Sequence, residues 1–202
     1  MKNLKILGLF SAFLFSTFTS AGVLIEPFVG FAAGSGDYAR TGATTRETKE
    51  TSMQFGGRLG YQFLGLMGGL EYRRSSGSYK FDGPSTLSFG LQPTKADYSG
   101  SEFGVFVGYN FPILARVYLG YAFNTKWEID TTNSWRAGKG DEISGSTTTL
   151  GVGFTGLPFV SINFEYRMIA LDKWKDISAN TETVVDENIN QLFVGISLPL
   201  DI

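Results

Sequence analysis

Apolar and polar residues alternate along much of the chain. From Met53 to Phe63 every second residue is apolar or glycine, while Gln54, Arg58 and Gln62 lie on the opposite parity. Because successive side chains of a β-strand point to opposite faces, this pattern predicts a strand with one apolar and one polar face. The alternation recurs along the chain. We expect strands at 23–33, 52–63, 66–76, 101–111, 115–125, 146–155, 159–169 and 189–200.

The connections between the expected strands alternate between short and long. Short turns are expected at 64–65, 112–114 and 156–158, and long polar loops at 34–51, 77–100, 126–145 and 170–188. A tilted strand of about ten residues can cross a bilayer, and outer-membrane barrels have short periplasmic turns and long extracellular loops. The pattern therefore predicts an all-β fold, an eight-stranded antiparallel up-and-down transmembrane β-barrel. Its apolar faces would point into lipid and both termini would be periplasmic.

The first residues have the features of a secretory signal peptide. Two lysines precede a continuous apolar stretch at 6–18, and small residues follow it. The stretch is too short to span a bilayer as a stable helix. We therefore expect residues 1–21 to be a cleaved signal peptide, with cleavage after Ala21 or Gly22, and residues 22–202 to form the barrel. An uncleaved amphipathic anchor is the alternative, but the segment has no polar stripe.

Composition narrows the possible functions. The 17 lysines and arginines include Lys2 and Lys5, so the mature chain has fewer bases than its 19 acids, which argues against nucleic acid as a partner. The chain contains neither cysteine nor histidine, the commonest ligands and bases of metal and catalytic sites. Carboxylates such as Glu71 and Glu102 could do acid–base work, but arginines are available to them. We expect no enzymatic activity, no metal and no cofactor.

The polar faces of the expected strands carry four acids and four arginines but no lysine. These residues form an expected charge network in the barrel interior: Glu26, Arg58, Glu71, Arg73, Glu102, Arg116, Glu165 and Arg167. The register imposed by a two-residue turn at 64–65 predicts that Arg58 lies opposite Glu71. An eight-stranded barrel leaves an interior about wide enough for side chains to fill, so we expect the paired charges to close it. The alternative is a narrow pore for small solutes or ions, favoured by many inward glycines.

Other side chains are candidates for contact with the membrane surface. Tyrosine and tryptophan favour the membrane–water interface. We expect interface aromatics at Tyr72, Tyr109, Tyr121, Trp127, Tyr166 and Trp174. Arg74, an outward residue at the outer end of its strand, could bind a lipid phosphate or extend to the interface without a specific partner. The acids of 170–188 could gather a divalent cation or form a solvated surface loop.

Two prolines lie in the first and last expected strands. Pro27 and Pro199 each lack the amide hydrogen that a strand ladder needs. Because these two strands must pair to close the barrel, we predict an imperfect seam near the periplasmic rim.

The chain resembles the small eight-stranded outer-membrane barrels of the OmpA/OmpX type over nearly its whole mature length, including Gly-Tyr-x-Phe at 60–63 before a tight turn. The resemblance implies a monomeric protein of the cell outer membrane of Gram-negative bacteria, surrounded by lipid and lipopolysaccharide. Family members typically end in an aromatic residue that the outer-membrane assembly machinery reads, whereas this chain ends in Asp201-Ile202. We expect a structural or surface-interaction role in the cell envelope, with an unknown extracellular ligand bound by the loops.

Overall fold

The computed structural model describes residues 21–39, 46–82, 94–132 and 138–202. The expected signal peptide therefore lies almost wholly outside the described residues. Within these ranges the protein is built from antiparallel strands, and no helix suited to crossing a membrane is found among them. The strands are β1 (Gly22–Ala39), β2 (Arg46–Phe63), β3 (Leu66–Asp82), β4 (Thr94–Phe111), β5 (Ala115–Thr132), β6 (Glu142–Leu157), β7 (Val160–Asp176), β8 (Thr181–Ser197) and the short β9 (Leu200–Asp201).

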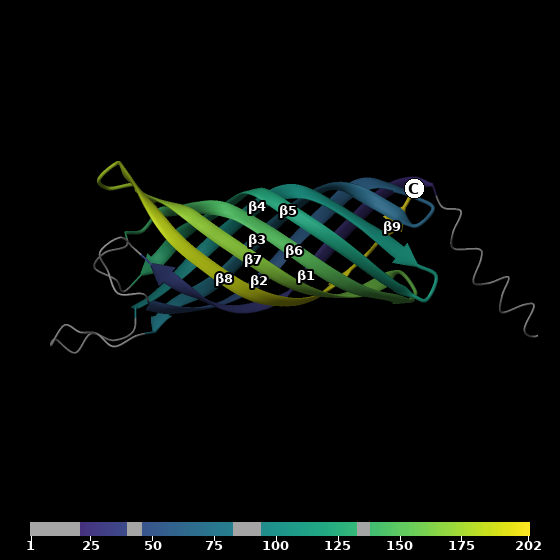
Figure 1. Cartoon of the computed structure of the whole chain (residues 1–202), viewed down its shortest axis with the longest axis horizontal. Helices are drawn as coiled ribbons and strands as arrows, with labels where there is room; N and C mark the ends of the chain where they lie inside the picture. The colour runs from purple at the N-terminus through teal and green to yellow at the C-terminus, as the bar shows by residue number, and fades with distance from the viewer. Residues whose placement is uncertain (1–20, 40–45, 83–93, 133–137) are drawn as a thin grey trace, which may run out of the picture.

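The eight long strands close into a barrel. Each pairs with its neighbours in sequence, and β1 pairs with both β2 and β8 (Figure 1). The register of the β2–β3 hairpin places Phe63 opposite Leu66 and Leu59 opposite Leu70, as the two-residue turn predicts. The predicted fold class, an eight-stranded up-and-down antiparallel barrel, is confirmed.

The two ends of the barrel differ. Gly22, Ile202 and the three short turns lie at one end, which we call the terminal end, and the amide of Val23 donates to the carbonyl of Ile202 at 2.8 Å. Strands β1, β3, β5 and β7 all finish at the opposite end, which we call the loop end (Figure 1). This arrangement follows from an even number of strands joined by hairpins.

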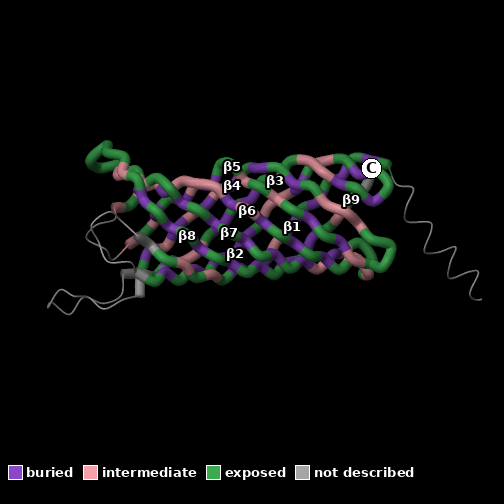
Figure 2. Tube along the Cα trace, viewed as in Figure 1, coloured by how far each residue is buried: buried purple, intermediate pink, exposed green. Residues whose placement is uncertain are grey.

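The strands continue well beyond their expected bounds toward the loop end. They contain 16 to 18 residues, so much of the four segments expected to be long loops is strand instead. The expectation failed because it ended each strand where the outward apolar residues stop, although the backbone ladder continues past that point. Figure 2 shows the alternation of buried and exposed residues running along the barrel, including this extension.

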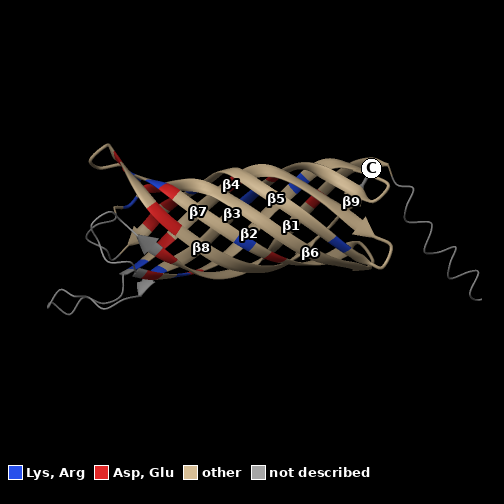
Figure 3. Cartoon of the chain, in the orientation of Figure 1, with Lys and Arg blue, Asp and Glu red and all other residues tan. Residues whose placement is uncertain are grey.

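Large apolar side chains cover the outside of the barrel next to the terminal end. Phe63, Leu66, Val107 and Leu119 are all more than half exposed. Toward the loop end this apolar belt stops at Phe31, Met53, Tyr72, Phe103, Phe123, Leu150, Met168 and Leu192. Beyond it polar outward residues predominate, although Val184 is 79% exposed, and charged residues gather at the loop end (Figure 3). The outer surface thus divides into an apolar belt and a polar extension.

The barrel seam is interrupted at the prolines. Strand β8 ends at Ser197, and pairing with β1 resumes only in β9, which faces Leu24 and Ile25. The amide of Leu198 donates to the carbonyl of Pro27 at 3.0 Å across the gap. The predicted imperfect seam is therefore present, at the terminal end.

Candidate functional site

The barrel interior is the largest assembly of polar chemistry in the described chain. Strand alternation brings all eight charged residues of the expected network to the inside. Seven of them are almost wholly buried, and the Glu71 side chain is 15% exposed. Buried charges are tolerated only when paired and hydrogen-bonded, so the geometry of the pairs decides what this interior can do.

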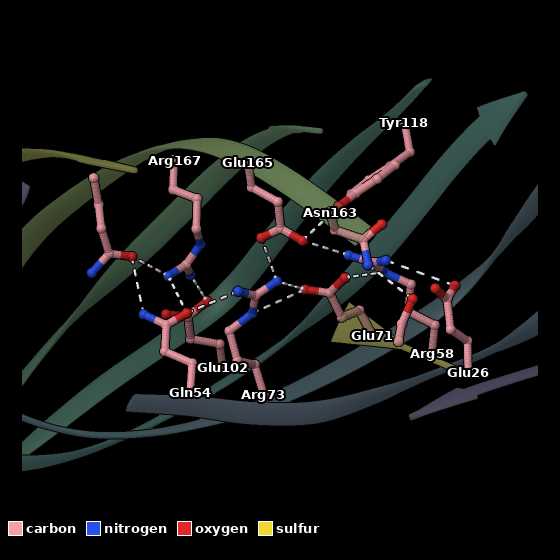
Figure 4. Close-up of polar contacts among 12 residues, drawn as sticks. Glu26, Gln54, Arg58, Glu71, Arg73, Glu102, Tyr118, Asn163, Glu165 and Arg167 are labelled. Atoms are coloured by element: carbon pink, nitrogen blue, oxygen red, sulfur yellow. Dashed lines mark hydrogen bonds and ion pairs between the residues drawn. The ribbon is translucent and has the colours of Figure 1, made fainter. Parts of the chain in front are cut away.

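Two arginines and two glutamates form the centre of the network (Figure 4). Arg58 lies opposite Glu71 in the β2–β3 ladder, and its Nε donates to Glu71 Oε2 at 2.6 Å. Its Nη2 donates to Glu165 Oε1 on β7 at 2.8 Å. Arg73 donates from Nη2 to Glu71 Oε1 at 3.0 Å and to Glu165 Oε2 at 2.7 Å. Glu165 therefore ties β7 across the lumen to two strands that it does not neighbour.

The network continues toward the terminal end. Arg116 donates to Glu26, whose other carboxylate oxygen lies 3.7 Å from Arg58 Nη1. Arg116 Nη2 also donates to Asn163 Oδ1 at 2.6 Å and to Ser197 Oγ at 3.0 Å. These contacts join β1, β5, β7 and β8 next to the interrupted seam.

Toward the loop end the pairs alternate with amide side chains. Arg167 donates to Glu102, which forms the fourth acid–base pair. Gln54 Oε1 accepts from Arg73 at 2.8 Å and from Arg167 at 3.0 Å. Gln191 then donates to Glu50, which also accepts from the Tyr98 hydroxyl. A connected polar chain thus runs through the interior from Tyr98 to Ser197.

Aromatic rings pack against the arginines. The guanidinium of Arg58 lies 4.2 Å from the ring centroid of Tyr118 and 5.2 Å from that of Phe28. Arg73 lies 4.7 Å from Phe28 and 4.8 Å from Phe193. Such contacts favour the cation, and the rings fill space that water would otherwise occupy. These aromatic and amide residues were not among the predicted site residues, although their inward parity was a signal that could have found them.

The loop end has an apolar interior instead. This outer cluster consists of Tyr79, Tyr98, Trp127, Ile143, Ile169, Leu171 and Ile189, with Trp174 packed against it. The rings of Tyr98 and Trp127 stack with centroids 4.4 Å apart. Inside the polar extension, the barrel therefore contains an apolar cluster, with the buried acids Glu50 and Glu187 beside it.

Two of the expected interface aromatics do not lie fully on the outer surface: Trp127 is buried and Trp174 is partly buried. The ladder shifts register between Ala122 and Thr125, and the extra residue turns Trp127 inward. In the pairing of β6 with β7, an extra residue between Leu171 and Lys173 turns Trp174 toward the outer cluster. A bulge reverses which parity faces the lumen, and simple alternation cannot locate it.

The four tyrosines of the expected interface lie on the outer surface. Tyr72, Tyr121 and Tyr166 are each more than two-fifths exposed, and Tyr109 lies on the same outward parity as Val107. The hydroxyl of Tyr166 donates to Asn190 Oδ1 at 2.8 Å, beyond the belt. Their contact with the membrane interface stays a prediction.

Glu187 is an isolated inward acid of the polar extension, outside the belt. It is buried beside Leu171, and neither carboxylate oxygen has a hydrogen-bond partner among the described residues. Burial raises the pKa of this carboxyl from 4.5 to about 8.

Because Glu187 points inward, it does not join the outward Asp172 and Asp186. No group of three or more acids suited to a metal ion occurs in the described part of the chain.

Removing the central arginine should destabilise the barrel. We expect Arg58→Ala to lower the free energy of unfolding by about 3–5 kcal/mol, because Glu71 and Glu165 keep their buried charge and lose a partner. Urea unfolding in detergent micelles measures this. Lys49→Ala, which removes an exposed pair with Glu47 at 3.7 Å, is the control and should cost under about 1 kcal/mol. Equal losses for the two variants would show that the internal pairing does not support the fold.

Glu187 should make stability depend on pH. Since its pKa is higher in the folded than in the unfolded chain, the protonated form is favoured by folding, and stability should fall as the pH rises from about 5 to about 8. Glu187→Gln should match the wild type near pH 5 and unfold at a higher temperature than it above pH 8. Thermal unfolding monitored by circular dichroism measures both midpoints. The exposed Asp172→Asn should follow the wild type, and parallel curves for wild type and Glu187→Gln would contradict the assignment.

Comparisons with known proteins identify the fold and no sequence family. No protein-family model matches the chain, and no curated protein sequence is similar to it. Among solved structures, the barrel is similar to the outer membrane protein OprG from Pseudomonas aeruginosa, with a TM-score of 0.56 and 16% identity over 91% of this chain and 98% of that one.

A second solved structure has the same architecture. It is Ail, the attachment invasion locus protein of Yersinia pestis, in complex with the heparin analogue sucrose octasulfate. The TM-score is 0.53 with 10% identity, over 89% of this chain and 99% of that one. At such identities the likeness concerns the fold alone. The chain has the fold of the small eight-stranded outer-membrane β-barrels.

Proposed function

We propose that this protein is an integral β-barrel of the outer membrane of a Gram-negative bacterium, with a closed interior and a structural or surface-interaction role. The observation that carries the proposal is the inversion of the barrel. Its outside is apolar and exposed, and the inside at the same level is charged and buried. A soluble protein rarely exposes a contiguous apolar surface of this extent, whereas a barrel in lipid requires one.

The height of the belt supports a membrane-spanning position. In β2 the outward belt residues run from Met53 to Phe63. Eleven residues rise about 36 Å along a strand, and a tilt of about 40° reduces this to about 28 Å along the barrel axis. The hydrocarbon core of a bilayer is about 30 Å thick. The expected signal peptide supplies export, and we place the terminal end toward the periplasmic side of the membrane and the loop end outside the cell.

Three barriers in series favour a closed barrel over the pore alternative. A cavity of about 200 Å³ opens at the terminal end, lined by residues that include Gln62, Asn110 and Arg116. It meets the pair of Arg116 with Glu26, behind which lies the arginine–glutamate centre. The outer cluster then fills the loop end. A pore would need all three to separate, although the inward glycines leave space for side chains to move.

The inward acids that could support catalysis are already engaged. Glu26, Glu71, Glu102 and Glu165 each bind at least one arginine. An acid that already binds a buried arginine is not free to contact a substrate. We therefore propose no enzymatic activity.

The outer surface offers contacts for lipid and lipopolysaccharide. Arg74, Ser101 and Lys126 are cross-strand neighbours on β3, β4 and β5, just beyond the belt. Arg74 and Lys126 lie two strands apart, about 10 Å. Lys126 Nζ pairs with Glu142 Oε1 at 2.6 Å, so Arg74 is the better placed of the two to bind a phosphate at the membrane surface. This surface would hold a monomer in the outer leaflet after its insertion by the outer-membrane assembly machinery. The connections at the loop end would bind any extracellular ligand.

Membrane extraction and conductance test the proposal together. The protein should leave cell envelopes only with detergent, and its gel mobility should change on heating. In planar bilayers the pure protein should give no reproducible conductance steps, because the paired charges close its interior. Release as a freely soluble protein would refute the membrane position, and steps from pure protein would establish the pore instead.

A further inference from the structure

The short turns at the terminal end are unusually apolar. Phe159 is 82% exposed and Ile113 is 75% exposed, both higher than most residues of the belt. The exposed apolar residues of the three turns, with the last residue of β6, are together called the apolar crown: Leu64, Ile113, Leu114, Leu157 and Phe159. No turn residue at 64–65, 112–114 or 158–159 is charged or amide-bearing. Turns that meet water normally carry glycine, asparagine, aspartate or serine.

Three members of the apolar crown also have a positive φ angle, a backbone conformation that favours glycine or asparagine over large apolar residues. The φ angles of Leu64, Leu114 and Phe159 are 50°, 63° and 63°. In this left-handed region the Cβ atom of a bulky residue is crowded by its own backbone, and glycine and asparagine are preferred there. Each turn thus holds a leucine or phenylalanine where the local geometry disfavours it.

The loop end provides a direct comparison, because its described turns also contain residues with a positive φ angle. There the residues with positive φ are Asn180, at 49°, and Gly140, at 88°. These are the residues that turn geometry prefers in water. At the terminal end only Gly65, with φ of 84°, is such a residue, and the other three positions with positive φ hold large apolar side chains.

The contrast between the residues at the two ends is explained if lipid surrounds the turns at the terminal end and water surrounds those at the loop end. An apolar side chain in a strained position is favourable only if its removal from water offsets the strain. The apolar crown is continuous with the belt, since Phe63, Leu66 and Phe111 lie directly beside its turns. Lipid that covers the belt can therefore cover the apolar crown without any further partner.

We propose that the terminal end of the barrel is immersed in the acyl-chain region of the inner leaflet, with the apolar crown in contact with phospholipid. This inference rests on the proposed membrane position. The barrel would then sit asymmetrically: the polar extension projects outside the cell, and the opposite end does not emerge into periplasmic water. Asn180 and its turn mark the end that is in water.

Labelling with a fluorescent probe tests the depth directly. The chain has no cysteine, so single cysteines can carry a nitrobenzoxadiazole label at Phe159→Cys, at the belt position Leu150→Cys and at the outer turn position Asn180→Cys. The labelled proteins are folded into vesicles of phosphatidylethanolamine and phosphatidylglycerol. Labels at 159 and 150 should emit at short wavelength and be quenched by lipids with spin labels on the acyl chains. The label at 180 should be quenched by iodide in the water.

The three positions separate the possible failures. If the label at 150 is not quenched by spin-labelled lipid, the proposed membrane position itself is wrong. If the label at 150 is quenched and that at 159 responds only to iodide, the barrel spans the membrane but the apolar crown lies in water. That second result overturns the inference and leaves the apolar crown to a periplasmic protein partner.

Asparagine substitutions in the apolar crown provide a second test, because the unfolding midpoint should rise if the turns lie in water and fall if they lie in lipid. In water, Leu114→Asn and Phe159→Asn would relieve the left-handed strain and raise the urea midpoint of unfolding. In lipid they place an amide among acyl chains, and we expect the midpoint measured in the same vesicles to fall. Asn180→Leu, the matched change at the loop end, should lower the midpoint as well, because that turn lies in water. Higher midpoints for the two asparagine variants would overturn the inference.

Discussion

Buried arginines and glutamates that bond across the lumen determine the organisation of this barrel. Arg58 and Arg73 hold Glu71 and Glu165 between them, and Glu165 comes from β7, on another part of the wall. A charge inside so narrow a barrel has little water to solvate it, so each must find its partner on another strand. Because a slip of one residue would turn every inward side chain toward lipid, the same pairs also favour a single strand register.

The barrel contains two kinds of interior, one above the other. At the level of the belt, apolar side chains face out and charges face in. In the polar extension the order reverses, and the outer cluster around Trp127 packs inside a polar wall. The backbone ladder continues through both levels. One barrel can therefore meet lipid around its lower part and water around its upper part without a change of fold.

The fold was predictable because its main determinants are local. Alternation located the strands at their terminal ends, and the two-residue turn set the register that brings Arg58 opposite Glu71. The bond from Arg58 to Glu165 could not be predicted, since it depends on how the closed sheet curves and staggers. Trp127 was misplaced because a bulge inserts one residue into β5 without a marked signal in the sequence.

The turns at the two ends of the barrel differ in residue type, and the solvent around each end explains the difference. Turns at both ends contain residues with a positive φ angle. At the loop end this residue is Asn180, whereas at the terminal end Leu114 and Phe159 have this conformation. Turn propensities alone would place the same residue types at both ends. The surroundings of each turn therefore influence its residues as strongly as its geometry does.

A double-mutant cycle on Arg58 and Glu165 tests most directly whether the pairs across the lumen hold the barrel together. The free energy of unfolding is measured for Arg58→Ala, for Glu165→Ala and for the double variant in the same vesicles. We expect the double variant to lose much less stability than the two single losses combined, because it leaves no partner charge stranded in the interior. Additive losses would show that Arg58 and Glu165 act independently and would contradict the account.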